Sequence, residues 1–292
     1  MTAALLPDRG VVKVAGDDAR KFLNGIVTAD VGKVTPQAPC YAALLTPQGK
    51  IIVDFLVAEA TAEDGGAFFL DCPAALAATL VERLGFYKLR AKVTVEELPL
   101  AVLAVWNGSG TTDHGLCYTD PRLPALGMRC ILPAEAAADA AAELATTLAS
   151  AEDYEAHRIA LGVPRGGLDF VYNDAFPHEA DMDQLNGVDF TKGCYVGQEV
   201  VSRVEHRGTA RSRVVPVAYE DFAPEAGVSV EAGDKTVGTM GSAAKGRGLA
   251  MLRLDRVGEA LAEGKPLMAG GVALKPLKPD WARFAFPGEA AE

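Results

Sequence analysis

The sequence lacks any long apolar run. No stretch approaches the roughly 18 to 20 consecutive apolar residues that a membrane-spanning helix needs. The first residues, Met1 to Arg9, meet charge too early to form a signal peptide. We therefore expect a cytoplasmic protein with no membrane partner.

Positive charge is also scarce. The chain holds 28 Lys and Arg against 39 Asp and Glu, a formal net charge of −11, which argues against an extended phosphate-binding surface. One short segment differs, since it gathers five cationic or titratable side chains: Arg203, His206, Arg207, Arg211 and Arg213. Two readings stay open for it, a weak local tRNA contact and a solvated, partly salt-bridged helix face.

Motifs for metal binding and hydrolysis are missing. The five cysteines form no C-x-x-C pair, the four histidines are scattered, and no serine lies in a Gly-x-Ser-x-Gly elbow. An odd, dispersed set of cysteines fits a reducing compartment. We expect no resident metal and no serine hydrolase.

The chain is long enough for more than one domain. Its 292 residues, 49% of them hydrophobic, suggest two or three globular units. Alternating strand and helix patterns occur twice, and short apolar runs separated by glycine and proline follow from Val214 onward. We expect an α+β protein with lobes at 1–106 and 107–212 and a small β-barrel at 213–292.

Local patterns place the elements of these units. In the first lobe we expect strands at 11–14, 41–46, 51–58, 68–71, 93–97 and 100–106, a helix capped by Asp17, and a helix from Pro73 to Leu84. In the second we expect a strand at 128–132 and helices at 134–149 and 153–161. Barrel strands are expected at 214–219, 228–231, 235–240, 249–254 and 271–274.

The reactive side chains concentrate at residues 190 to 208. Cys194 stands between Gly193 and Gly197, and two glycines so placed indicate a backbone bent close to a neighbour. A helix is expected from Gln198, with Glu199 and Arg203 as an i, i+4 pair. A helix N-terminus and the charge of Lys192 would both favour a thiolate at Cys194. A buried, inert cysteine is the alternative.

Residues 192–199, Lys-Gly-Cys-Tyr-Val-Gly-Gln-Glu, resemble the signature of the YgfZ-type folate-binding family. The segments 22–30, 158–164 and 176–179 resemble other parts of that family, so the similarity spans most of the chain. The family is similar in fold to the glycine-cleavage T-protein, an aminomethyltransferase. The resemblance implies two interleaved α+β lobes around a folate cleft, a C-terminal barrel, and a role in iron–sulfur enzyme maturation.

The resemblance also implies site residues, a cofactor and partners. Cys194 and Lys192 would be the reactive pair, and tetrahydrofolate would be held by Asp54, Glu179, Tyr195, Gln198, Glu199 and Arg203. Tyr195 could stack on the pterin or wedge the bend against the core, and Asp54 could bind ligand or form a buried ion pair. A monomer is expected, with iron–sulfur assembly or client proteins as partners, including radical enzymes that modify tRNA.

An enzyme of the T-protein kind is the alternative function. Such an enzyme, a folate-dependent one-carbon transferase, has a pterin-gripping glutamate in the segment that resembles 158–162. In this chain Ala160 stands at that place. An accessory factor is therefore favoured over a transferase.

Overall fold

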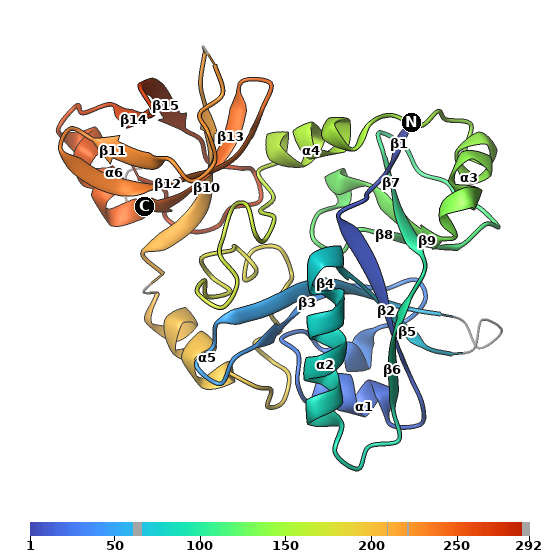
Figure 1. Cartoon of the computed structure of the whole chain (residues 1–292). Helices are drawn as coiled ribbons and strands as arrows, with labels where there is room; N and C mark the ends of the chain where they lie inside the picture. Colours follow the sequence, from blue (N-terminus) through green and yellow to red (C-terminus); the bar gives the residue numbers. More distant parts are fainter. Residues whose placement is uncertain (61–65, 209, 221, 288–292) are drawn as a thin grey trace. The chain divides into compact units, whose positions relative to one another are not determined.

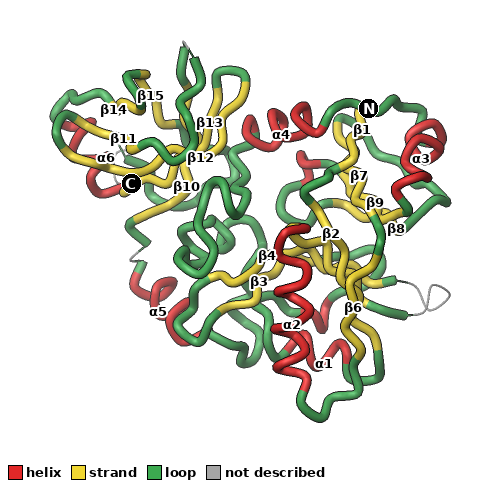
Figure 2. Tube along the Cα trace, in the orientation of Figure 1, coloured by secondary structure: helices red, strands yellow, loops and turns green. Residues whose placement is uncertain are grey.

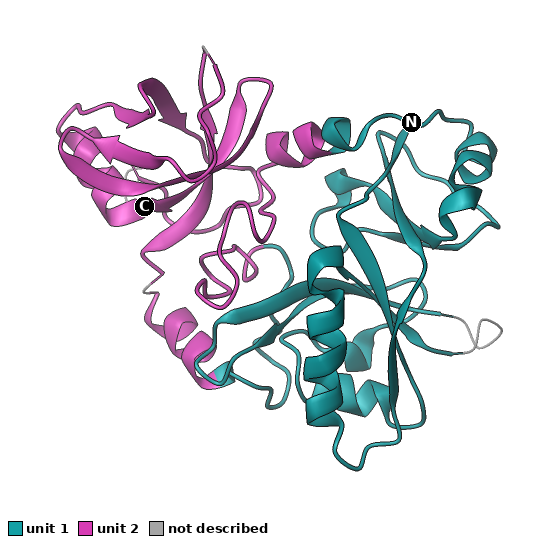
Figure 3. Cartoon of the chain, viewed as in Figure 1, with its two compact units in different colours: residues 1–154, 185–198 teal, residues 155–184, 199–292 magenta. Residues whose placement is uncertain are grey.

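The computed structural model describes residues 1–60, 66–208, 210–220 and 222–287. The chain divides into two compact units (Figure 3), one of residues 1–154 with 185–198, the other of residues 155–184 with 199–292. The chain thus leaves the first unit and returns to it with the segment that carries Cys194. The domain bounds expected above stay a prediction from the sequence.

A five-stranded antiparallel sheet is the centre of the first unit (Figures 1 and 2). In spatial order its strands are β3 (Cys40–Leu45), β4 (Ile51–Glu59), β5 (Phe68–Pro73), β2 (Arg9–Ala15) and β6 (Thr94–Leu98). One face packs against α1 (Ala19–Asn24) and α2 (Ala77–Lys88) in a single apolar cluster. Period-two alternation of apolar residues along the strands supplies this face.

The helices of this lobe differ in detail from the sequence prediction. α1 has Asp18, not Asp17, at its N-cap, and the Asp18 carboxylate accepts a hydrogen bond from the Lys92 backbone N–H at 2.8 Å. α2 begins at Ala77, after a 3₁₀ turn at Ala74–Leu76, and continues to Lys88. Apolar periodicity located both helices but not their ends.

A second, four-stranded sheet completes the first unit. Its order is β1 (Thr2–Leu5), β7 (Ala101–Trp106), β9 (Met128–Leu132) and β8 (Leu116–Thr119), and α3 (Ala137–Glu143) covers one face. The helix expected to reach residue 149 ends early, because Ala145 has a left-handed φ of 51°. α4 (Ala151–Ala160) follows.

The inner faces of the two sheets share a buried network of charges. Asp71 of β5 binds Arg129 of β9 at 2.9 Å and Arg9 of β2 at 2.6 Å, and the Tyr118 hydroxyl donates to it at 3.1 Å. Burial alone would raise the pKa of Asp71, but the two guanidinium groups hold it below its usual value. The network thus fixes how the sheets stack, since each buried charge has a partner.

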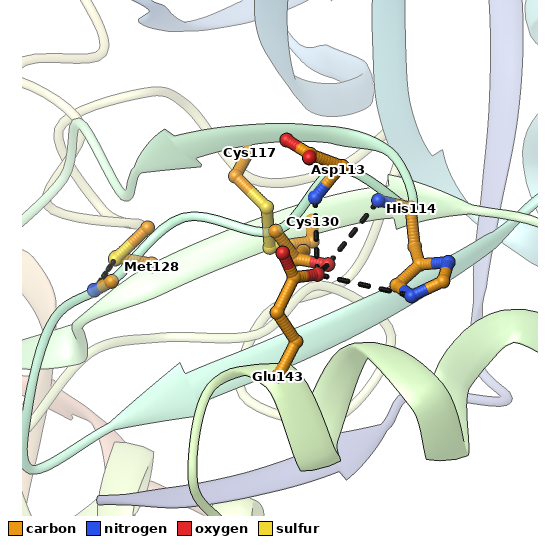
Figure 4. Close-up of a disulfide and its surroundings, with 8 residues drawn as sticks. Asp113, His114, Cys117, Met128, Cys130 and Glu143 are labelled. Carbon is orange, nitrogen blue, oxygen red and sulfur yellow. Dashed lines mark hydrogen bonds and ion pairs between the residues drawn. A yellow bond between two sulfur atoms is a disulfide. The ribbon is translucent and has the colours of Figure 1, made fainter.

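A disulfide joins β8 to β9 (Figure 4). Cys117 and Cys130 face each other across the ladder with Cα atoms 4.0 Å apart. Beside it, the Glu143 carboxylate accepts hydrogen bonds from the Thr112 hydroxyl and the Asp113 backbone N–H. The expectation that dispersed cysteines stay reduced is therefore wrong for this pair, because strand pairing brings together residues that sequence spacing keeps apart.

The second unit is built on a closed six-stranded barrel. Around the barrel the strands are β10 (Ser212–Ala218), β13 (Arg247–Arg253), β12 (Lys235–Ala244), β11 (Ser229–Ala232), β14 (Leu267–Ala269) and β15 (Val272–Pro276). The sequence prediction located five of these strands. It missed β14 and α6 (Leu254–Ala262), which shares the barrel core.

Buried Arg158 ties the non-barrel part of this unit to the barrel. Its guanidinium binds Asp169 at 2.9 Å and donates to the Ser242 hydroxyl of β12 at 2.9 Å. Asp169 in turn accepts hydrogen bonds from the backbone N–H and hydroxyl of Ser242. The segment 164–184, which has no helix or strand, is thus held by ionic contacts.

Candidate functional site

Asp189 organises the turn that leads to Cys194. One of its oxygens accepts hydrogen bonds from the hydroxyl and N–H of Thr191 at 2.7 and 2.8 Å and from the N–H of Lys192 at 3.1 Å. The other pairs with Lys33 at 2.7 Å. Burial alone would raise the pKa of Asp189, yet these donors hold it well below its usual range. The carboxylate therefore stays charged and keeps the turn closed.

Thr28 docks this turn onto the N-terminal lobe. Its hydroxyl donates to the Gly187 carbonyl at 2.6 Å and accepts from the Ala43 N–H at 2.9 Å. Its own carbonyl accepts from the Asp189 N–H at 3.0 Å. The segment 22–30, which carries part of the family resemblance, thus lies against the turn that leads to Cys194.

Lys192 is a clamp on the same loop. Its ammonium donates to the carbonyls of Asn24, Val27 and Ala29 at 2.8, 2.7 and 2.7 Å. Burial lowers the pKa of Lys192 to about 8, and the charges of Asp30, Cys40 and Asp189 oppose this shift. The predicted role of activating Cys194 stays a prediction; the geometry assigns Lys192 to holding the turn.

Cys194 itself is exposed, unlike the buried Cys72. The two glycines beside it differ. Gly197 has φ of +80°, and a Cβ there would lie 2.5 Å from the Thr46 carbonyl in the β3–β4 turn, whereas a Cβ at Gly193 would meet nothing within 4 Å. The close approach expected from the sequence is confirmed at Gly197 only. α5 (Gln198–Arg207) begins directly after it, as predicted.

Tyr195 points inward from this turn. It is buried, its hydroxyl has no hydrogen-bond partner among the described residues, and burial raises its pKa to about 12. The Lys192 ammonium lies 5.2 Å from the centre of its ring. Of the two roles left open, wedge and stacking platform, this burial supports the wedge. Gln198 accepts a weak hydrogen bond from the Tyr195 N–H at 3.4 Å.

Asp54 lies inside β4 and is buried. The Tyr41 hydroxyl donates to it at 2.9 Å. Tyr41 also lines a cavity of about 390 Å³ in the first unit. The other residues around this cavity are Pro39, Cys40, Thr119, Asp120, Pro121, Pro124 and Asn186. Asp54 thus lies one hydrogen bond behind a cavity-lining residue, and its contact with a ligand stays a prediction.

The remaining predicted residues belong to the second unit. Glu179 accepts a hydrogen bond from the Phe176 N–H at 2.9 Å and lines two cavities, of about 510 and 260 Å³. Glu199 and Arg203 form the expected pair on exposed α5. Ala160, the last residue of α4, is exposed.

The basic segment is smaller than its sequence suggests. Arg213 is buried and binds Asp181 at 3.0 Å and Asp183 at 2.8 Å, and the tRNA contact stays a prediction. His178, Asp183 and Glu205 place ligand atoms within 4.8 Å of one another. Because Arg213 already holds both Asp183 oxygens, we assign no metal to this group.

Sequence reasoning missed the supporting residues Thr28, Tyr41 and Arg129. A signal existed for Arg129, which interrupts an otherwise apolar strand, and a charge in such a place needs a buried partner. Thr28 and Tyr41 gave no comparable signal, because hydroxyl groups are ordinary in a loop and a strand.

Comparison with known proteins agrees with this architecture. Residues 211–284 match the model of the CAF17 C-terminal beta-barrel domain. The fold resembles the crystal structure of glycine cleavage system aminomethyltransferase T from Bartonella henselae, with a TM-score of 0.76, 15% identity, and coverage of 98% of this chain and 87% of that one. The predicted T-protein-like α+β fold with a small barrel is confirmed.

Sequence relatives decide the family. The chain is 32% identical to "Iron-sulfur cluster assembly factor IBA57, mitochondrial" of Mus musculus, over 96% of this chain and 85% of that protein. The Homo sapiens protein of the same name is 31% identical, over 94% and 84%. The chain belongs to the IBA57 family. The YgfZ-type resemblance was right for the broader group, and IBA57 is the branch within it.

Two features of the IBA57 relatives bear on the predictions made from the sequence: their length and their location. The Mycosarcoma maydis homolog is 36% identical over 74% of this chain, but the match spans only 57% of that protein. These relatives are named as mitochondrial. The expectation of a cytoplasmic protein, based on an unremarkable N-terminus, is wrong by this comparison.

Proposed function

We propose that this chain is an iron–sulfur cluster assembly factor whose Cys194 thiol acts on a cluster or on the protein that carries it. The names of its IBA57 relatives, iron–sulfur cluster assembly factors, support the first part. The observation that carries the second is an exposed thiol on a turn that Asp189, Lys192 and Gly197 hold in place. A turn so firmly held pre-organises the sulfur toward a partner.

Complementation tests the thiol. In cells that lack the family's endogenous member, Cys194→Ser is expected to lose support of iron–sulfur enzyme activity, while Cys72→Ala keeps it. Cys72 is the control because its thiol is buried, has a pKa raised to about 12 by burial, and lies outside the cavity beside Tyr41. Full rescue of iron–sulfur enzyme activity by Cys194→Ser would contradict the proposed role of the thiol. Assaying tRNA-modifying radical enzymes alongside others would identify the clients.

Tetrahydrofolate is the finer part of the proposal. The cavity beside Tyr41 is lined by apolar side chains, those of Pro39, Pro121 and Pro124, and by the polar groups of Thr119 and Asn186. Such a mixed lining suits a ring with polar edges. Both Asp120 oxygens are taken by arginines. Tyr41, backed by Asp54, is therefore our candidate for the pterin contact, and folate binding would supply a one-carbon carrier.

A titration distinguishes the folate proposals. Tetrahydrofolate binding is expected to weaken about tenfold in Tyr41→Phe, since one hydrogen bond is lost, and to be unchanged in Cys194→Ser. Equal affinity in Tyr41→Phe would remove this cavity as the site. The transferase alternative requires turnover of a methylamine-bearing substrate with tetrahydrofolate; exposed Ala160, which offers no carboxylate, counts against it.

A further inference from the structure

The end of α2 and the loop to β6 carry two large apolar side chains in solvent. Phe86 is 76% exposed and Leu89 is 89% exposed. This tip lies at the bottom of the first unit as drawn in Figure 1, where the chain turns from α2 into β6. We call residues 83–92 the α2 tip. Exposing both side chains gives up the free energy that burial would supply.

The backbone of the α2 tip is unfavourable as well. Leu89, the C-cap of α2, has φ of 45° and ψ of −107°, a conformation that a branched residue adopts at a cost. Glycine would relieve that cost, because it has no Cβ. A strained leucine that is 89% exposed contributes little to this fold, so its use is expected outside the chain.

Cations accompany the two apolar side chains in the sequence. Four cations lie within the α2 tip: Arg83, Lys88, Arg90 and Lys92. Three acidic residues lie near them: Glu82 precedes the tip, Asp17 pairs with Lys92 at 3.6 Å, and Asp18 accepts a hydrogen bond from the Lys92 N–H. In a chain of net charge −11, this local positive charge gives an anionic surface one favourable approach.

We propose that the α2 tip docks on an anionic lipid bilayer, with Phe86 and Leu89 inserted among the acyl chains and the cations at the headgroups. No helix of the described residues has the length and apolar character to cross a bilayer, so the contact is peripheral. Apolar side chains beside Lys and Arg are the usual composition of such interfacial segments.

Other partners fit the α2 tip less well. Two side chains expose too little apolar area for a stable protein interface. A nucleic acid would use cations and stacking rings, yet the most exposed apolar residue is Leu89, which is aliphatic and cannot stack. A bilayer needs no matching pocket and accepts an aliphatic and an aromatic side chain equally.

Vesicle co-sedimentation of the full chain tests the proposal. The wild type is expected to bind vesicles of phosphatidylcholine mixed with phosphatidylglycerol, and to bind pure phosphatidylcholine at least about tenfold more weakly. Phe86→Ser/Leu89→Asn is expected to lose at least about tenfold in binding to the mixed vesicles. Leu89→Gly alone should raise the Tm while it lowers binding, because glycine accepts this positive φ without a Cβ clash.

Phe222→Ser is the matched control. Phe222 is 66% exposed, in the second unit, and follows acidic residues. It is expected to bind mixed vesicles like the wild type. Equal binding by Phe86→Ser/Leu89→Asn and the wild type, equal binding to both vesicle types, absence of binding, or full release by added tRNA would each overturn the proposal.

Discussion

The two glycines beside Cys194 look alike in the sequence and differ in the folded chain. Gly197 lies in the left-handed region against the Thr46 carbonyl, while Gly193 lies in open space with an ordinary φ. Only Gly197 is therefore required by the backbone. This difference gives a direct test of what holds the thiol.

Gly197→Ala is expected to lower the free energy of unfolding by at least about 2 kcal/mol, because both the φ and the added Cβ are unfavourable. Gly193→Ala should stay within about 0.5 kcal/mol of the wild type. Urea denaturation of both variants checks this. A similar loss in the two would contradict the assigned geometry.

Lys192 gives a pH-dependent signal. Its pKa is about 8 in the folded chain against 10.5 for an ordinary lysine, so the unfolded chain binds the proton more tightly. Stability therefore rises as pH increases from about 8 to 10.5. We expect the free energy of unfolding to rise over this window in the wild type relative to Lys192→Met. If the free energy of unfolding changed with pH in the same way in the wild type and in Lys192→Met, a lowered pKa of Lys192 would be excluded.

At the scale of elements, β8 is the edge of its sheet and is only four residues long. Edge strands of this length are weakly held by their ladder. The Cys117–Cys130 disulfide therefore carries much of the attachment of β8 to β9.

Reduction of this disulfide is expected to lower the free energy of unfolding by about 3 kcal/mol, since a cross-link across 13 residues restricts the unfolded chain. Denaturation with and without dithiothreitol measures the loss. The free energy of unfolding of Cys117→Ser/Cys130→Ser should equal that of the reduced wild type and should not change with dithiothreitol. If dithiothreitol still lowered the stability of that variant, the effect would belong to another group.

Local patterns predicted most elements because they depend on neighbours in the chain. Short apolar segments gave β3, β4 and β9, and helical spacing with the Glu199–Arg203 pair gave α5. The disulfide and the Asp71–Arg129 pair depend on which strands become neighbours, which no local pattern encodes. Within the site, Cys194 was predictable from its motif, but the clamp role of Lys192 required the three carbonyls of a distant loop.

The proposed membrane contact gave no sequence signal for another reason. A search for long apolar runs detects membrane-spanning helices only. The α2 tip has just two exposed apolar residues, Phe86 and Leu89, which are three positions apart in the sequence. Only their exposed fractions reveal the surface.

At the scale of the whole molecule, each compact unit depends on buried charges. In the second unit Arg158 connects α4, the segment 164–184 and β12 through Asp169 and Ser242. Removing one partner of such a buried pair leaves the other charge without compensation.

Arg158→Met is expected to cost about 3–5 kcal/mol because buried Asp169 loses its guanidinium partner. Arg165→Met is the control, since the Arg165 side chain is 28% exposed and pairs with Glu155; it should cost less than about 1 kcal/mol. Thermal denaturation followed by circular dichroism compares them. Equal losses would contradict the central role of Arg158.

The contacts of Thr28 and Lys192 also bear on the order in which the chain folds. Thr28 and Gly187 are 159 positions apart, and Lys192 and Asn24 are 168 apart. During synthesis the loop at residues 24–29 therefore emerges long before Lys192, whose ammonium donates hydrogen bonds to the carbonyls of that loop. Contacts between residues so far apart in the sequence form slowly. The cysteine turn is thus among the last parts to be placed, so an incompletely folded chain does not present its thiol in the final geometry.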